Sequence, residues 1–362
     1  MKNILNIFIC LCICGCTKYN HKSTNESLSI KSSEKTVGIK ELFYDFKLLY
    51  LKTDEESAFQ NINKIVYHNN YYILDKSGRR QVLVFDKDGN YLHSIGRTGK
   101  GKGEYTNIED FTIDEKNNKI IILAFPSTAF VYDMQGEFLL SKKLDNNTLL
   151  WNIISNDNGY ICTTNHMTYT EGEHAYLMYF FDKDFNLLAK RQNVLPKQMP
   201  IPSTVTKPIM KLCDNNYVYM DIFSSNVYNI DLTDSISITT KHIGLNNPVP
   251  LEVFEDVNTF MSNQTLYDYI ISAITVNNKL LVFYKDENDV RVFITDMHKD
   301  ETISYEYRNW FPELMYGKDS VIYSKINPRM VAINHEIFDS LSLEQAKNYA
   351  NEIILTFKCK FQ

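Results

Sequence analysis

The sequence has no large excess of positive or negative charge. Its 38 Lys and Arg against 44 Asp and Glu leave a net charge of −6, and only 23% of the 362 residues are charged. A nucleic-acid-binding chain is strongly basic, and a disordered chain combines low hydrophobicity with high net charge. The slightly acidic net charge argues against the first class, and the hydrophobic content of 44% argues against the second.

Cysteine is scarce in the body of the chain. Four of the seven cysteines lie in the first 16 residues, and only Cys162, Cys213 and Cys359 follow. Three cysteines in a large chain cannot form a disulfide framework, and their spacing matches no metal or redox motif. We expect three buried thiols, with a single disulfide as the alternative.

Glycine and proline are also few, at 13 and 9, whereas aromatic residues are abundant, with 24 Tyr and 21 Phe. Aromatic residues favour pleated, half-buried strands. This balance predicts an all-β protein.

The N-terminus has the pattern of a secretory signal. Lys2 precedes a run of 11 mostly apolar residues, 4–14, which is too short to span a membrane. The run ends in Ile-Cys-Gly-Cys at residues 13–16, which resembles the bacterial lipobox. We therefore predict a signal peptide over residues 1–15, lipid attachment at Cys16, and a flexible polar tether over residues 16–40. The alternative is a simple secretory signal whose cysteines are hydrophobic filler.

The rest of the chain, residues 41–362, repeats a hairpin pattern six times. Strand-like residues stop at a short Asn/Asp/Gly turn and then resume. These turns lie at residues 69–70, 117–118, 157–159, 215–216, 277–278 and 318–320. Asn and Asp tolerate the left-handed backbone that tight hairpins need.

A second turn follows each of the first five hairpins. Its aspartates Asp86, Asp133, Asp182 and Asp231 are separated by 47, 49 and 49 residues. Four strands in about 50 residues match the period of a propeller blade. We therefore predict a six-bladed β-propeller of four-stranded antiparallel sheets. The strand-like residues 42–51 should join residues 353–361 in the last sheet and close the ring. A capping box at residues 342–345 predicts a short helix inserted in that sheet.

The segment 84–105 (VFDKDGNYLHSIGRTGKGKGEY), the strand at the front and the final strand after a short helix resemble one known group. That group is the six-bladed β-propeller lipoproteins of the bacterial envelope, which are similar to NHL and TolB-like propellers. The resemblance implies an architecture and an envelope location, and no general activity.

The glycine-rich segment 96–103 contains the G-x-x-x-x-G-K opening of a phosphate-binding loop. Gly103 replaces the required Ser or Thr, and a strand pattern follows where a helix should begin. We interpret it as a link between blades, with Arg97, Lys100 and Lys102 as candidate ligand contacts. The Asp-rich turn at residue 86 resembles a calcium loop, but Arg97 occupies its twelfth position. The eight histidines form no zinc signature, so we predict no metal site and no cofactor.

The leading hypothesis for function is a non-catalytic scaffold that binds a protein, peptide or glycan through its loop face. The alternative is a propeller hydrolase or lyase whose catalytic groups converge at the channel mouth from different blades. We expect the protein to be lipid-anchored in the bacterial cell envelope, at the outer membrane. Its expected partners are the membrane and an envelope protein or glycan, without nucleic acid.

Overall fold

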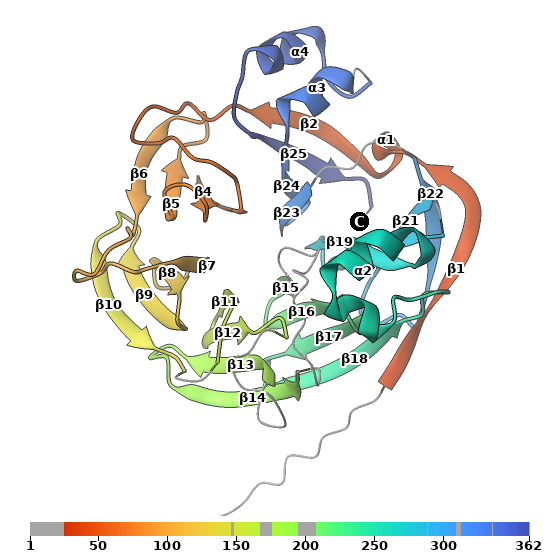
Figure 1. Cartoon of the computed structure of the whole chain (residues 1–362), viewed down its shortest axis with the longest axis horizontal. Helices are drawn as coiled ribbons and strands as arrows, with labels where there is room; N and C mark the ends of the chain where they lie inside the picture. Colours follow the sequence, from red (N-terminus) through yellow and green to blue (C-terminus); the bar gives the residue numbers. More distant parts are fainter. Residues whose placement is uncertain are drawn as a thin grey trace, which may run out of the picture.

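The computed structural model describes residues 25–145, 148–166, 176–194, 208–287, 289–308, 313–334 and 336–361. The regular structure of the described chain is mainly β-strand, and from β2 onward the strands follow one another around a ring (Figure 1). Three sheets each consist of four consecutive antiparallel strands. They are β3 (Lys64–His68), β4 (Asn70–Asp75), β5 (Gln81–Phe85) and β6 (Tyr91–Ile95); β7 (Ile108–Asp114), β8 (Lys119–Ala124), β9 (Thr128–Asp133) and β10 (Phe138–Lys143); and β11 (Asn152–Asn156), β12 (Gly159–Thr163), β13 (Tyr176–Asp182) and β14 (Leu187–Asn193).

A fourth sheet joins the two ends of the chain. Its order is β2-β25-β24-β23, from β2 (Phe43–Leu49), β25 (Ile353–Cys359), β24 (Val321–Ile326) and β23 (Glu313–Lys318). Phe43 pairs with Cys359 and Leu49 with Ile354, in antiparallel register. The pairing agrees with the expectation that residues 42–51 lie beside residues 353–361. It leaves β2 as the outer strand of the last sheet.

The fifth sheet has nine strands and corrects the predicted fold. Its order is β15 (Ile209–Cys213), β16 (Asn216–Asp221), β17 (Asn226–Asp231), β18 (Ser237–Ile243), β1 (Asn25–Val37), β22 (Glu301–Tyr307), β21 (Asp289–Thr295), β20 (Lys279–Asp286) and β19 (Tyr269–Val276). Strand β1 pairs in parallel with both β18 and β22 and so joins two runs of four strands. The prediction of six four-stranded sheets is therefore wrong: the described strands form four such sheets and one nine-stranded sheet.

Strand β1 lies in the stretch expected to be a tether, of which residues 16–24 are outside the described part. From Asn25 onward the chain forms a strand of 13 residues, followed by the short helix α1 (Ile39–Leu42). Leu28 and Val37 are buried, although most of their neighbours are polar. With so few apolar residues the segment has a weak strand pattern, and its partners lie more than 200 residues away.

The predicted hairpin turns are present. Asn69, Asn118, Asn215 and Asn277 all have a left-handed backbone, with φ between 50° and 61°. Each lies between the first and second strands of a run, as expected for a residue that tolerates this conformation. The second turns are built by aspartates: the carboxylate of Asp182, for example, accepts from the backbone N–H of Asp184 (2.9 Å) and Asn186 (2.7 Å).

Two helical insertions interrupt the strand order. The first, between β18 and β19, contains η1 (Leu251–Glu255), α2 (Val257–Asn263) and η2 (Gln264–Leu266). The second, between β24 and β25, contains α3 (Pro328–Ile333) and α4 (Ser340–Lys347) and lies outside the ring (Figure 1). A helix was expected here, but its cap is Asp339, whose carboxylate accepts from the Ser342 N–H at 2.7 Å. None of the helices described here has the length and apolar character needed to cross a bilayer.

Candidate functional site

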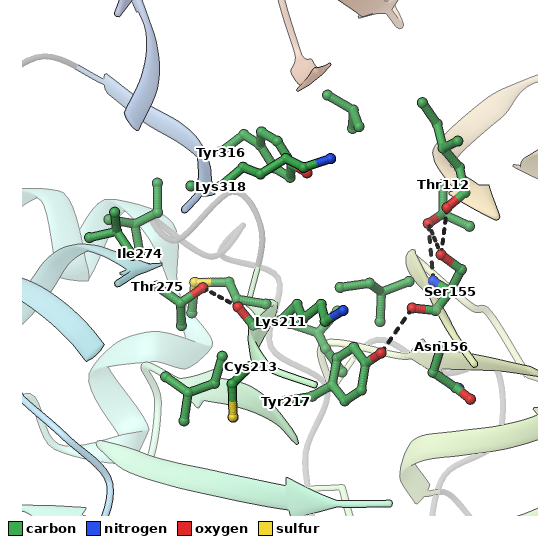
Figure 2. A pocket seen from close by; sticks show the side chains of 18 of the residues that line it. Thr112, Ser155, Asn156, Lys211, Cys213, Tyr217, Ile274, Thr275, Tyr316 and Lys318 are labelled. Atoms are coloured by element: carbon green, nitrogen blue, oxygen red, sulfur yellow. Dashed lines mark hydrogen bonds between the residues drawn. The ribbon is translucent and has the colours of Figure 1, made fainter. Parts of the chain in front are cut away.

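A cavity of about 710 Å³ lies at the centre of the ring. Its walls come from the innermost strands β3, β7, β11, β15, β19 and β23, together with the turns that follow several of them. Figure 2 shows this cavity, with Tyr316 and Lys318 on one wall and Thr112 and Ser155 on another. The volume falls within the range of small-molecule sites, which we take as about 300–1,000 Å³.

A buried ion pair holds three of the innermost strands together. The Lys64 ammonium on β3 lies 2.7 Å from Asp110 Oδ1 on β7 and also donates to the Phe111 carbonyl oxygen at 2.6 Å. The other carboxylate oxygen, Asp110 Oδ2, accepts from the Ile153 N–H of β11 at 2.9 Å. The side chains of Lys64 and Asp110 are only 11% and 5% exposed. Their charges are thus compensated by each other and by hydrogen bonds to the backbone.

Hydroxyl groups continue this network along the cavity wall. The Ser155 N–H donates to Thr112 Oγ1 at 3.0 Å, and the Ser155 hydroxyl donates to the Ile113 carbonyl oxygen at 2.6 Å. The Tyr217 hydroxyl donates to the Ser155 carbonyl oxygen at 3.2 Å (Figure 2). These bonds satisfy the Ser155 N–H and the carbonyl oxygens of Ile113 and Ser155, and they tie β7, β11 and β16 together at this wall.

Charged groups in and beside the strand ends that line the cavity are also paired. Glu115 Oε1 lies 2.8 Å from the Lys318 ammonium and 3.4 Å from His68 Nδ1. Burial alone would raise the pKa of Glu115, but Lys318 and His68 outweigh it and hold the pKa below its usual value. Lys211 Nζ lies 3.1 Å from Asp214 Oδ1. The lining contains four lysines and six carboxylates.

The three body cysteines are free thiols in different environments. Cys162 and Cys359 are buried, and burial raises the pKa of Cys359 to about 12. Cys213 is partly exposed and lines the cavity (Figure 2). The expectation of buried thiols is therefore confirmed for Cys162 and Cys359 and is wrong for Cys213. Among the described residues, no group of three or more His, Cys, Asp or Glu side chains could hold a metal ion.

The predicted ligand contacts lie elsewhere. Arg97, Lys100 and Lys102 belong to the link between β6 and β7, and the cavity lining contains none of them. Within this link, the Glu104 carboxylate accepts from the Gly101 N–H at 2.7 Å and lies 2.6 Å from Arg97 Nε. The Glu104 carboxylate thus occupies two donors, the Gly101 N–H and Arg97 Nε, that a bound anion would use. Cys16, the predicted lipid attachment point, is outside the described residues.

Sequence reasoning missed a buried pair formed by β16 and the turn after β12. His166 Nε2 lies 3.1 Å from Asp221 Oδ2, and both side chains are 2% exposed. Burial would raise the pKa of Asp221, but His166 and hydrogen bonds from Ser224 and Phe223 hold it below its usual value. The two residues are 55 positions apart and carry no motif, so no local signal could have joined them.

Comparisons place the chain among proteins of similar fold. A family model described as "Domain of unknown function (DUF4934)" matches residues 25–356. A candidate exported protein of Bacteroides fragilis has a TM-score of 0.69 at 19% identity, covering 92% of this chain and 100% of its own. A DUF4221-family protein of Bacteroides vulgatus has a TM-score of 0.61 at 9% identity, covering 88% and 98%. No curated protein matches the sequence.

At such identities the two structures show the fold alone, which is all-β and propeller-like. The comparisons confirm the resemblance noted from the sequence at that level. They do not confirm membership of the NHL and TolB-like lipoproteins.

Proposed function

Because the chain belongs to the family described as a domain of unknown function (DUF4934), its own site must supply the argument, and we propose that it is an exported, non-catalytic binding protein. Its central cavity takes a small polar ligand, or the end of a peptide or glycan chain. The similar Bacteroides fragilis protein, a candidate exported protein, supports export. The proposed partners are an envelope protein or glycan.

The cavity is the observation that carries this proposal. Every run of four strands contributes its innermost strand to the wall, so the cavity is supported on all sides by hydrogen-bonded sheets. Rigid, preformed cavities with a few convergent polar groups are typical of ligand sites. Such a site loses little conformational freedom when a ligand enters.

The state of the ionisable groups favours binding over catalysis. A general acid at neutral pH needs a raised carboxyl pKa. Glu115, which lines the cavity, has a lowered pKa and is paired with Lys318. Lys64 with Asp110, and Lys211 with Asp214, are likewise engaged with each other. These three pairs therefore supply no general acid; the lining carboxylates Asp114, Asp157 and Asp319 lie outside them.

Cys213 provides a direct test of the binding site. We expect saturation with a bound ligand to slow maleimide labelling of Cys213 at least about tenfold, because the thiol lines the cavity. The probes are an array of defined oligosaccharides and an array of tripeptides. Labelling is read from the Cys213 peptide by mass spectrometry.

The matched control is Ser141→Cys in a Cys213→Ser background. Ser141 is exposed on β10, away from the cavity, so the new thiol should react at the same rate with and without probe. Unchanged labelling of Cys213 with every probe would contradict the binding function.

We also propose that Cys16 carries a lipid anchor that holds the protein in the bacterial envelope, at the outer membrane. The lipobox-like residues 13–16 support this. Cys16→Ala should abolish incorporation of labelled palmitate and release the protein from the membrane fraction, because it removes the acyl chains on which stable anchoring depends. Cys14→Ala is the matched control and should keep both label and membrane association. Equal labelling of the two variants would contradict the assignment.

A further inference from the structure

We infer that the ligand of the cavity is a neutral carbohydrate, and that the wall formed by Tyr316, Lys318 and Glu115 recognises it. This inference rests on the binding function proposed above and names the ligand class. It comes from one sector of the cavity, where β23 and the turn after β7 meet.

Tyr316 is a rigid aromatic surface. Its ring packs against Tyr323 with centroids 5.7 Å apart, and Tyr323 stacks on Tyr67 at 5.4 Å. Tyr71 completes the cluster, 5.0 Å from Tyr67. Tyr323 is only 7% exposed, so the cluster supports Tyr316 from behind while Tyr316 lines the cavity. A ring held in this way offers contact area without a large loss of side-chain entropy.

A fixed donor and a fixed acceptor lie beside this ring. Lys318 is two residues from Tyr316 on the same strand, so both side chains extend from the same face of β23 (Figure 2). The Glu115 carboxylate holds the Lys318 ammonium at 2.8 Å. Its contacts with Lys318 and His68 both use Oε1, and the Glu115 side chain remains 48% exposed. Its second oxygen takes part in neither contact, so a ligand hydroxyl can donate to it.

The combination suits a sugar ring. One face of a sugar carries C–H groups that pack on the negative face of an aromatic ring. Its hydroxyls both donate and accept, so neighbouring hydroxyls can use Lys318 and Glu115 together. A purely apolar ligand would bury both charged groups without hydrogen bonds, at a large cost.

The charge of the cavity disfavours an anionic ligand. Four lysines and six carboxylates line it, an excess of two negative charges that opposes an anion. Three of the lysines are already paired with carboxylates, as described above. At Asp110, Asp214 and Glu115, a cation would compete with those lysines for the same carboxylate oxygens. A neutral, hydroxyl-rich ligand requires no such exchange.

The test measures binding of neutral oligosaccharides, acidic oligosaccharides and tripeptides to the full chain, followed by titration of the tightest binder. We expect a neutral oligosaccharide to bind tightest. Tyr316→Ala should weaken its affinity at least about tenfold because it removes the aromatic surface, whereas Tyr316→Phe should stay within about threefold. Tyr44→Ala is the matched control: Tyr44 is a 45% exposed tyrosine on β2, outside the cavity, and its loss should change nothing.

Glu115→Ala guards against a Tyr316 variant that does not fold, because Glu115 is half exposed and lies in a turn. It should weaken binding at least about fivefold. Sugar affinity that both Tyr316→Ala and Glu115→Ala leave unchanged overturns the inference. Binding of tripeptides or acidic sugars, with no neutral sugar bound, overturns the inference and leaves the binding function in place. If no probe binds or protects Cys213, both fail.

Discussion

Asp110→Ala is expected to lower the free energy of unfolding by about 3–5 kcal/mol, because removing one partner of a buried ion pair leaves the other charge uncompensated. Lys64 would lose its carboxylate partner in a site where its side chain is only 11% exposed. The Ile153 N–H would also lose its acceptor, which adds an unsatisfied backbone donor. Urea denaturation followed by circular dichroism measures the loss.

A surface pair of the same length is the control. Lys31 and Glu301 join β1 to β22 at 2.7 Å, as do Lys64 and Asp110 across β3 and β7, but their side chains are 65% and 51% exposed. Exposed pairs contribute about 0.2–1 kcal/mol, so Glu301→Ala should cost no more than that. Similar losses in the two variants would show that burial does not control the contribution of the pair.

Phe357→Ala should cost about 3–5 kcal/mol, because it opens a cavity at a fully buried position. The Phe357 ring on β25 packs at 4.8 Å against Phe43 and at 5.6 Å against Phe46, both from the N-terminal segment. These contacts hold β2 in the last sheet and so close the ring. We therefore expect the substitution to loosen β2 as well as to destabilise the protein.

Limited proteolysis separates the two effects. Cleavage within Phe43–Leu49 should become faster in Phe357→Ala, since β2 would detach first. Phe85→Ala is the control: Phe85 is equally buried, on β5 of the first sheet, and should cost a similar free energy. Equal cleavage of β2 in both variants would mean that Phe357 has no special part in closing the ring.

Local patterns in the sequence predicted the turns of this fold well. Asn69 and Asn118 mark hairpins because their left-handed backbone is a property of a few neighbouring residues. The Asp182 turn is equally local, since its hydrogen bonds reach only two and four residues ahead. The pairing of residues 42–51 with the last strand followed from counting strands, so it needed no contact information.

Features made by distant segments could not be predicted in this way. Only two hydrophobic residues of β1, Leu28 and Val37, are buried. The strand edges that β1 covers, on β18 and β22, form only after two other runs of strands have folded. The cavity residues show the same limit: Lys64 and Asp110 are 46 positions apart. The glycine-rich link suggested a ligand contact at Arg97, but in the structure Arg97 pairs with the nearby Glu104.

The parallel course of β1 also determines how the ring would respond to tension. A pull on its N-terminal end acts along the strand, so the hydrogen bonds to β18 and β22 are loaded in shear, many at once. Antiparallel strands pulled apart from a hairpin end would instead lose their bonds one after another. Force applied through a membrane attachment upstream of Asn25 would therefore be shared between the two runs of strands that β1 joins. The ring would then resist a force large enough to detach a strand paired on one side only.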